Sequence, residues 1–166
     1  MYFRFLLISL SLFFSGCVAE DRDHGFHHSV ITDGGQAWES GSSGALTASV
    51  IERGWDDETT SEILLITMVS AGEPYGLEEL QFEVFGKFEG RHAIGETAAA
   101  GLLLRGGEYD CLAWDNGERR DAVTGEIDIN IDDGWASGTY ALELEGHDGD
   151  ERCGFEVVDG WFLAEL

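Results

Sequence analysis

Strict alternation of apolar and polar side chains over residues 126–132 is the feature that most constrains the fold of this 166-residue chain. The segment reads Glu-Ile-Asp-Ile-Asn-Ile-Asp, so three isoleucines are separated by acidic or amide side chains. A period of two places alternate side chains on opposite faces of a β-strand, whereas an α-helix has a period of about 3.6. The segment therefore predicts a strand with Ile127, Ile129 and Ile131 on its core face and four polar side chains in water.

Shorter alternating or apolar segments occur along most of the chain, and turn residues separate them. Residues 61–71 are apolar on both faces, which is typical of a strand covered on each side. Leu77 to Leu80 favour one helical turn, but no long stretch has helical periodicity. We therefore predict an all-β fold, an antiparallel β-sandwich or barrel of about nine to ten strands. The expected strands are 45–53, 61–71, 81–85, 92–98, 102–105, 109–114, 126–132, 135–145, 155–158 and 161–166.

Two short segments carry strong turn signals. Asp133-Gly134 follows the alternating strand directly, and Asp115-Asn116-Gly117 follows the expected strand 109–114. Asp-Gly and Asn-Gly pairs are favoured in tight β-hairpins because both residues tolerate a positive φ angle. We therefore expect each pair to join neighbouring antiparallel strands. Residues 146–150 are expected to form a further turn.

The first 17 residues form a separate unit. One positive charge, Arg4, precedes an apolar stretch from Phe5 to Phe14, and Ser15-Gly16 then lead to Cys17. A basic start, an apolar core of about ten residues and small residues before the cut are the layout of a secretory signal. A membrane-spanning helix is disfavoured because it needs about 20 apolar residues.

A cysteine directly after two small residues makes this segment resemble a bacterial lipoprotein signal. The resemblance implies cleavage before Cys17, acylation of its sulfur and amine, and attachment of the mature chain to a membrane through that lipid. Val18, rather than Asp, follows the cysteine, which by the sorting habit of the family implies the outer membrane. Phe14 departs from the aliphatic residue that the family prefers, so an ordinary cleaved signal is the alternative.

These boundaries predict three parts of the chain. Residues 1–16 are expected to be the lipoprotein signal peptide, and residues 17–29 the lipidated Cys17 with a flexible tether. Residues 18–29 are polar and lack periodicity, which is typical of a linker. The remaining residues, 30–166, have the length of one ordinary domain.

The chain contains five histidines, a residue type that can bind metal ions. His24, His27 and His28 are closely spaced, and such imidazoles can hold a transition metal. On a mobile tether, however, they have no fixed further ligand, so a polar linker is the expectation. His92 and His147 stand alone in the sequence and are expected at the surface or in turns.

Acidic side chains dominate the composition, with 33 Asp and Glu against nine Lys and Arg and a formal net charge of −24. Nucleic acids and anionic lipid headgroups are bound by clustered Lys and Arg, so these partners are excluded. Ten Phe, five Trp and four Tyr are enough apolar side chains to build a core. The charge is therefore interpreted as a solvated shell over a folded domain rather than as a sign of disorder.

Two cysteines remain if Cys17 carries lipid, namely Cys111 and Cys153. Export places them in an oxidising compartment, where a disulfide is the expected state. Closing a loop of about 43 residues would remove roughly 4 kcal/mol of unfolded-state entropy. Two buried free thiols are the alternative, and without a histidine partner the pair does not form a zinc site.

Clusters of aspartate raise the question of calcium, which takes several oxygen ligands from one site. None of the acidic turns matches the spacing of an EF-hand loop. Asp128, Asn130 and Asp132 share one strand face, which is also the pattern of any strand exposed to water. We therefore expect solvated surface, with no metal and no other cofactor. The acidic turns are 56–58, 115–118, 132–133 and 148–151.

Catalytic signatures find little support in the sequence. The segments 41–44 and 134–138 place serine near glycine but miss the Gly-x-Ser-x-Gly spacing of a nucleophile elbow. A cysteine nucleophile would forgo the predicted disulfide, and no phosphate loop or dinucleotide fingerprint occurs. The five tryptophans lie near strand ends or turns, where they pack a core edge or form an exposed platform for a glycan or a partner protein.

The last stretch of the chain has a second, looser likeness. Gly125-x-Ile127-x-Ile129, Gly138-Thr139-Tyr140 and Gly160-Trp161-Phe162 resemble the closing hairpins of small exported β-domains in bacterial lipoproteins. Those domains have no assigned activity, so the resemblance implies a β fold but indicates no function.

Together, these features predict a non-enzymatic, membrane-tethered β-domain that acts in binding or in envelope structure. Its expected partners are the membrane, through the lipid, and an envelope protein or a glycan. A barrel that holds a small apolar ligand and a hydrolase are the alternatives.

Overall fold

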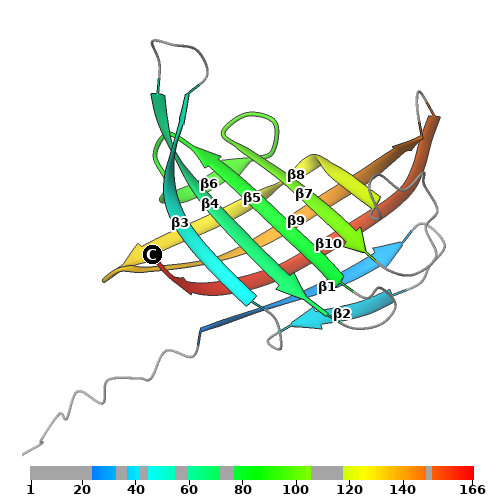
Figure 1. The fold of residues 1–166 in the computed structure, drawn as a ribbon, viewed down its shortest axis with the longest axis horizontal. Coiled ribbons are helices and arrows are strands. Elements are labelled where there is room, and N and C mark those ends of the chain that lie inside the picture. The colour runs from blue at the N-terminus through cyan, green and yellow to red at the C-terminus, as the bar shows by residue number, and fades with distance from the viewer. Residues whose placement is uncertain are drawn as a thin grey trace, which may run out of the picture.

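The computed structural model describes residues 24–32, 37–41, 45–54, 60–71, 77–105, 118–148 and 151–166. These residues form ten β-strands (Figure 1). The strands are β1 (Gly25–Thr32), β2 (Ala37–Gly41), β3 (Ala45–Gly54), β4 (Thr60–Ser70), β5 (Leu77–Phe85), β6 (Gly90–Ala93), β7 (Ala98–Arg105), β8 (Glu118–Asp132), β9 (Trp135–Asp148) and β10 (Glu151–Glu165). The described part of the chain contains no helix long and apolar enough to span a bilayer.

All ten strands belong to one sheet, in the order β2-β1-β10-β9-β8-β7-β5-β4-β3, with β6 paired to β8 outside this path. Every ladder is antiparallel. From β3 to β10 the path is a meander, and β1 pairs with β10, the last strand. Figure 1 shows the sheet curled into a half-barrel, with β3, β4, β5 and β7 crossing in front of β8, β9, β10 and β1. The predicted all-β antiparallel fold is confirmed.

Two irregularities accompany this curl. The register shifts between Ala122 and Thr124 on β8, and again between Cys153 and Phe155 on β10. An extra residue in one strand bends that strand and increases its twist, as β-bulges generally do. At the N-terminal end of β1, His24 Nε2 lies 2.9 Å from the carbonyl oxygen of Leu46 on β3. The half-barrel has two walls, one formed by β3, β4, β5 and β7 and the other by β8, β9, β10 and β1. This hydrogen bond joins the start of β1 in one wall to β3 in the other.

Alternation of side chains decides which face of the sheet is buried. On β5 every second residue is buried, and on β8 the predicted inward residues Ile127 and Ile129 are 0% and 2% exposed. Ile131 packs partly buried against the same core. Tyr140, Leu142 and Leu144 on β9 are also buried, as their alternation predicts. Each fully buried side chain of this size contributes roughly 1.5–3 kcal/mol, and those facing inward from both walls form one core.

The hairpin between β8 and β9 confirms the predicted turn. Asp133 and Gly134 have φ angles of +48° and +79°, which is the conformation of a two-residue type I′ hairpin. Glycine adopts a positive φ without steric cost, and aspartate tolerates it better than most residues. The N–H of Leu166 donates to the Gly134 carbonyl at 2.8 Å, so the last residue is held against this turn.

Several predicted boundaries are wrong. β1 begins at Gly25, so residues 25–29, assigned to the tether, belong to the sheet. Residues 77–80 open β5 instead of forming a helical turn. The expected strands 155–158 and 161–166 are one continuous strand, β10. In each case a long ladder with a neighbouring strand overrides the local pattern, because the ladder satisfies every backbone N–H and C=O in turn.

Several predictions lie outside the described residues. These are the signal peptide 1–16, lipidated Cys17, the rest of the tether up to residue 23, and the strand and hairpin at 109–117 with Cys111.

Candidate functional site

The outer face of β8, β9 and β10 carries polar side chains and one exposed tryptophan in register. Asp128 on β8 lies opposite Thr139 on β9, which in turn lies opposite Trp161 on β10. The next row toward the β8–β9 hairpin contains Asn130, Ser137 and Leu163. All six side chains point away from the core because they alternate with buried residues on their own strands.

These side chains line an open groove of about 670 Å³. Trp161 and Leu163 lie on one side of it, and the side chains of β8 lie on the other, because β9 runs between the two strands. Ser137 and Thr139, with their small side chains, lie between the two walls. Trp161 is 46% exposed, so a large part of its indole is open to a ligand. The wall on β8 consists of Asp128, Asn130 and Asp132.

Glycine at position 138 allows the strands below the groove to pack closely. A Cβ atom on Gly138 would lie 2.7 Å from Cε1 of the Phe162 ring and 2.3 Å from the Asp128 carbonyl oxygen. Phe162 is 1% exposed and fills the space behind Gly138 on the inner face. Its neighbour Trp161 therefore projects to the outer face, where the groove lies.

The described part of the groove is lined by acidic but not by basic side chains. Among the described residues that line it, none is Lys or Arg. Arg91 on β6 pairs in register with Asp128, but its guanidinium Nη1 lies 3.5 Å from Glu126 Oε2. On the far side of Trp161, His27 Nε2 lies 3.6 Å from Glu39 Oε2. The groove itself thus presents hydroxyl, amide and carboxylate groups beside a single indole.

A second set of polar side chains lies inside the half-barrel. His28 on β1, Ser70 on β4, Glu78 on β5 and Tyr140 on β9 are all buried, with between 1% and 5% of their surface exposed. His28 Nε2 lies 3.4 Å from Glu78 Oε2, and the Ser70 hydroxyl donates to the same oxygen at 3.4 Å. The Tyr140 hydroxyl lies 3.3 Å from His28 Nδ1. These four side chains, called the inner network below, connect the two walls of the half-barrel.

Tyr140 is almost completely buried within this inner network. Burial, with a smaller contribution from the carboxylate of Asp159, raises the pKa of Tyr140 well above its ordinary value. The phenol therefore keeps its proton, which it can donate either to His28 Nδ1 or to the Met68 sulfur 3.6 Å away. The ring packs against Phe82 with a centroid separation of 4.9 Å.

Gly160 makes room for the inner network. A Cβ atom at this position would lie 2.7 Å from the Tyr140 hydroxyl oxygen, 2.7 Å from His28 Cβ and 2.3 Å from the His27 carbonyl oxygen. A larger residue would thus push β1 away from β10 and separate Tyr140 from His28. The sequence Gly160-Trp161 therefore serves both faces, with the glycine inside and the indole outside.

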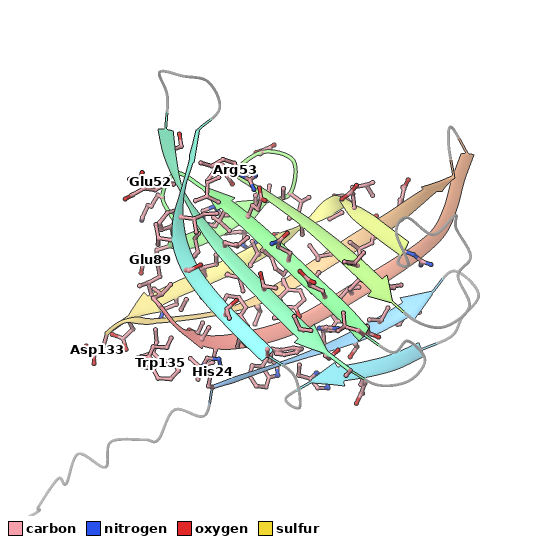
Figure 2. The ribbon with its side chains drawn as sticks, in the orientation of Figure 1. His24, Glu52, Arg53, Glu89, Asp133 and Trp135 are labelled. Atoms are coloured by element: carbon pink, nitrogen blue, oxygen red, sulfur yellow. The ribbon has the colours of Figure 1, made fainter. Side chains whose placement is uncertain are left out.

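The tether histidines have different positions from those predicted. His24 hydrogen-bonds to Leu46, and its ring lies edge-on to Trp135 at 6.3 Å. Figure 2 shows His24 and Trp135 at the lower left of the view, next to Asp133 and below Glu52 and Arg53. The expectation that residues 24–29 form a solvated linker is therefore wrong, because β1 continues the sheet and carries His28 into the core.

His92 is also misplaced by the sequence prediction. It is 5% exposed rather than at the surface. Its Nε2 lies 3.0 Å from the Phe88 carbonyl oxygen, and its Nδ1 lies 3.3 Å from the Thr97 hydroxyl. The imidazole thus holds together the connection between β5 and β7.

Sequence reasoning placed Tyr140 on the inner face but missed the other three members of the inner network. Its signal is alternation: His28 lies between Phe26 and Val30, and Glu78 is followed at every second position by apolar residues of β5. A polar residue that keeps the period of buried neighbours points into the core. The pairing of His28 with Glu78, 50 residues apart, has no local signature.

The remaining predicted sites have the following positions. Cys153 lies on β10 opposite Gly146, and Cys111 is outside the described residues, so their disulfide stays a prediction. Asp128, Asn130 and Asp132 do share an exposed face, as predicted. Within the described ranges, no group of three or more His, Cys, Asp or Glu residues is arranged to hold a metal ion.

A second hollow of about 650 Å³ lies over β5 and β7, on another part of the sheet. At its rim Arg53 and Glu83 form a bidentate ion pair with distances of 2.5 and 2.8 Å. Small residues, Ala99 and Gly101, line this hollow on β7. The described lining of this hollow contains no aromatic side chain, and in this it differs from the groove beside Trp161.

Comparisons with known proteins gave no relatives. No protein-family model matches the chain, and neither the curated proteins nor the solved structures contain a match.

Proposed function

We propose that this protein is a non-enzymatic lipoprotein of the bacterial envelope, held at the outer membrane by lipid on Cys17, whose β-domain binds a ligand in the groove beside Trp161. The anchor is supported by the apolar stretch and the small residues that precede Cys17. The binding role is supported by the structure of the outer face. A tether and an exposed groove on one domain suit a protein that holds material at the membrane surface.

One observation carries the binding proposal: Trp161 is 46% exposed beside a groove with a polar opposite wall. Large aromatic side chains are normally turned toward a core, and an exposed indole is a favoured anchor for ligands and partners. Covering roughly 100 Å² of indole would contribute about 2–3 kcal/mol to binding. Strand β9 beneath the groove is paired with β8 on one side and with β10 on the other, so the site needs little ordering when a ligand arrives.

The alternative of an apolar ligand inside the barrel has less support. Inward-facing side chains such as Ile66, Leu80 and Phe82 are completely buried against one another. The inner face also carries the inner network, whose polar groups would lose their partners if an apolar molecule entered. The outer groove offers a ligand more accessible surface.

The hydrolase alternative also has less support. The inner network contains the residue types of acid–base catalysis, in the sequence Glu78–His28–Tyr140. A catalytic group has to reach its substrate, and these three side chains are 1–3% exposed. Their geometry fits a structural link between the two walls.

Binding to isolated cell envelopes tests this function. Mature protein in mild detergent is mixed with envelopes of cells that lack it, and bound protein is measured after sedimentation. We expect Trp161→Ala to weaken binding by about tenfold or more, because the main apolar contact is lost. Val157→Ala is the matched control, since Val157 is exposed on the same strand but does not line the groove. Equal binding of the Trp161→Ala variant and the parent would contradict the proposal.

A further inference from the structure

We infer that the ligand of the groove is an uncharged oligosaccharide, an inference that rests on the proposed binding function and names its ligand class. A sugar ring has an apolar face of C–H groups and a rim of hydroxyl groups. A site for it needs a flat aromatic surface together with planar hydrogen-bonding side chains. The groove provides both, with Trp161 on β10 and the Asp128–Asp132 face of β8.

The two walls match these two parts of a sugar. The exposed indole of Trp161 presents a flat apolar surface for the C–H face. Asp128 and Asp132 accept hydrogen bonds from sugar hydroxyls, and Asn130 both donates and accepts. The hydroxyls of Ser137 and Thr139 add further donors and acceptors along the floor.

The spacing of the β8 wall favours a chain of sugars over a single ring. Side chains at alternate positions of a strand lie about 7 Å apart. Asp128, Asn130 and Asp132 therefore form a row of polar groups along the direction of the strand. The small side chains of Ser137 and Thr139 keep the floor low along the same direction. An extended ligand lying parallel to β9 would meet several of these groups at once.

Charge disfavours anionic sugars as the ligand of the groove. The net charge of the chain is −24, and the described lining of the groove contains two aspartates and no Lys or Arg. Carboxylated, sulfated and phosphorylated sugars would be repelled by this field. An uncharged saccharide avoids the repulsion and uses the carboxylates as hydrogen-bond acceptors.

The surroundings of Trp161 favour a saccharide over a protein partner. Energetically central residues of protein interfaces are enclosed by neighbouring contacts that exclude water. Trp161 instead has His27 and Thr139 beside it across the strands, and five of the nine described residues that line the groove are polar. An exposed apolar pair, Ile31 and Val157, lies further along β1 and β10 and outside the groove. Such a solvent-exposed site, with one aromatic residue among polar side chains, suits a polyhydroxylated ligand.

The test titrates the mature full-length protein with defined soluble oligomers of glucose, mannose, galactose and N-acetylglucosamine. Binding is followed by tryptophan fluorescence and by saturation-transfer NMR, which detects weak ligands. We expect at least one uncharged oligomer to bind, with an affinity that changes less than about twofold between roughly 0.05 M and 0.5 M sodium chloride. A carboxylated oligomer of the same sugar should bind about tenfold more weakly at low salt.

Variants locate the site. Trp161→Ala should weaken sugar binding by about tenfold or more, Trp161→Phe by less, and Asn130→Ala by roughly threefold to tenfold. Val157→Ala should bind like the parent. Circular dichroism checks that each variant is folded. If Trp161→Ala does not fold, the binding of Trp161→Phe and Asn130→Ala decides whether the sugar binds in the groove.

Three results would overturn the inference. If envelope binding depends on Trp161 but none of the sugars binds, the ligand class is wrong while the proposed function stands. If a basic peptide such as oligolysine binds through Trp161 and the sugars do not, the groove takes a protein partner. If sugar binding is unchanged in all groove variants, the sugar site is elsewhere. Envelope binding that is independent of Trp161 would instead contradict the proposed function itself.

Discussion

The inner network and the outer groove lie on opposite faces of the sheet and share strand β9, yet they have opposite properties. Thr139 and Tyr140 are consecutive on β9, and the first borders the groove while the second is buried in the inner network. Gly160 and Trp161 form a similar pair on β10. The face on which a side chain lies therefore decides whether it contributes to stability or remains available to a ligand.

The two regions also differ in the solvent exposure of their carboxylates. Glu78 is 3% exposed and is held by His28 and Ser70. Asp128 and Asp132 on the outer face are exposed to water. Changes to the inner network should therefore alter the free energy of unfolding, and changes to the groove should alter binding.

The largest expected effect is at Glu78. Glu78→Ala removes the shared acceptor of His28 and Ser70 and leaves two buried polar groups without this partner, so it should lower the free energy of unfolding by about 3 kcal/mol. Urea denaturation measures the change. Glu78→Gln, which retains the shape and a hydrogen-bonding oxygen, should cost about 1 kcal/mol.

Glu79→Ala is the matched control for this position. Glu79 is the next residue on β5 and points to the outer face, so its loss should change stability by less than about 0.5 kcal/mol. Similar losses for Glu78→Ala and Glu79→Ala would mean that the inner network does not connect the two walls.

Tyr140→Phe should have a smaller effect at neutral pH, about 1 kcal/mol, because the ring remains and one hydrogen bond is lost. The pH dependence is more specific. The pKa of Tyr140 is raised in the folded state, so its stabilising contribution is fully present below the unfolded pKa of about 10 and is lost as pH rises above it.

The slope of this loss can be measured by urea denaturation between pH 8 and about 11. Stability should fall by up to about 1.4 kcal/mol more per pH unit above pH 10 in the parent than in Tyr140→Phe, because one additional proton is released on unfolding. Parallel curves for the two proteins would show that Tyr140 ionises equally in both states.

Salt should stabilise the folded protein by screening the repulsion between its acidic side chains. Screening of the net charge of −24 is expected to raise the melting temperature by a few degrees at moderate sodium chloride, in the parent and in Glu78→Gln alike. Calcium and magnesium at equal ionic strength should give equal shifts. A specific calcium site would add about 2.7 kcal/mol at a hundredfold excess over its Kd, so a calcium-only rise of several degrees would contradict the account.

The smallest expected change is the stability of Trp161→Ala. Because the side chain is 46% exposed, its loss should lower the free energy of unfolding by no more than about 1 kcal/mol, while ligand binding falls about tenfold or more. Thermal melts and binding are measured on the same sample. A large loss of stability with unchanged binding would place Trp161 with the inner network rather than with the groove.

How much of this the sequence could predict differs between the two faces. The strand at 126–132 and the inward side chains of β9 were predicted because their polarity agrees with their burial. The shared face of Asp128, Asn130 and Asp132 was predicted by the same alternation. The exposure of Trp161 was left open, since an indole near a strand end packs into a core in some proteins and is exposed in others.

Most of the inner network was missed because its residues are polar at inward positions. His28 and Glu78 keep the period of their buried neighbours, but His28 was assigned to a polar linker and Glu78 to a helical turn. Their contact depends on the curl of the whole sheet, which brings β1 beside β5 although neither strand pairs with the other. Such a long-range contact is a property of topology and register, and a local sequence pattern does not contain it.

The most direct test of the central claim is an NMR titration with the envelope-derived ligand or the best-binding oligosaccharide, in which side chains on the two faces are followed together. Assigned signals of the Trp161 indole N–H and the Asn130 amide report on the groove, and methyl signals of Ile127 and Leu142 report on the buried face. The account predicts saturable shifts of Trp161 and Asn130 with the methyl signals unchanged. Saturable shifts of the Ile127 and Leu142 methyls with Trp161 unaffected would contradict it and place the ligand inside the half-barrel.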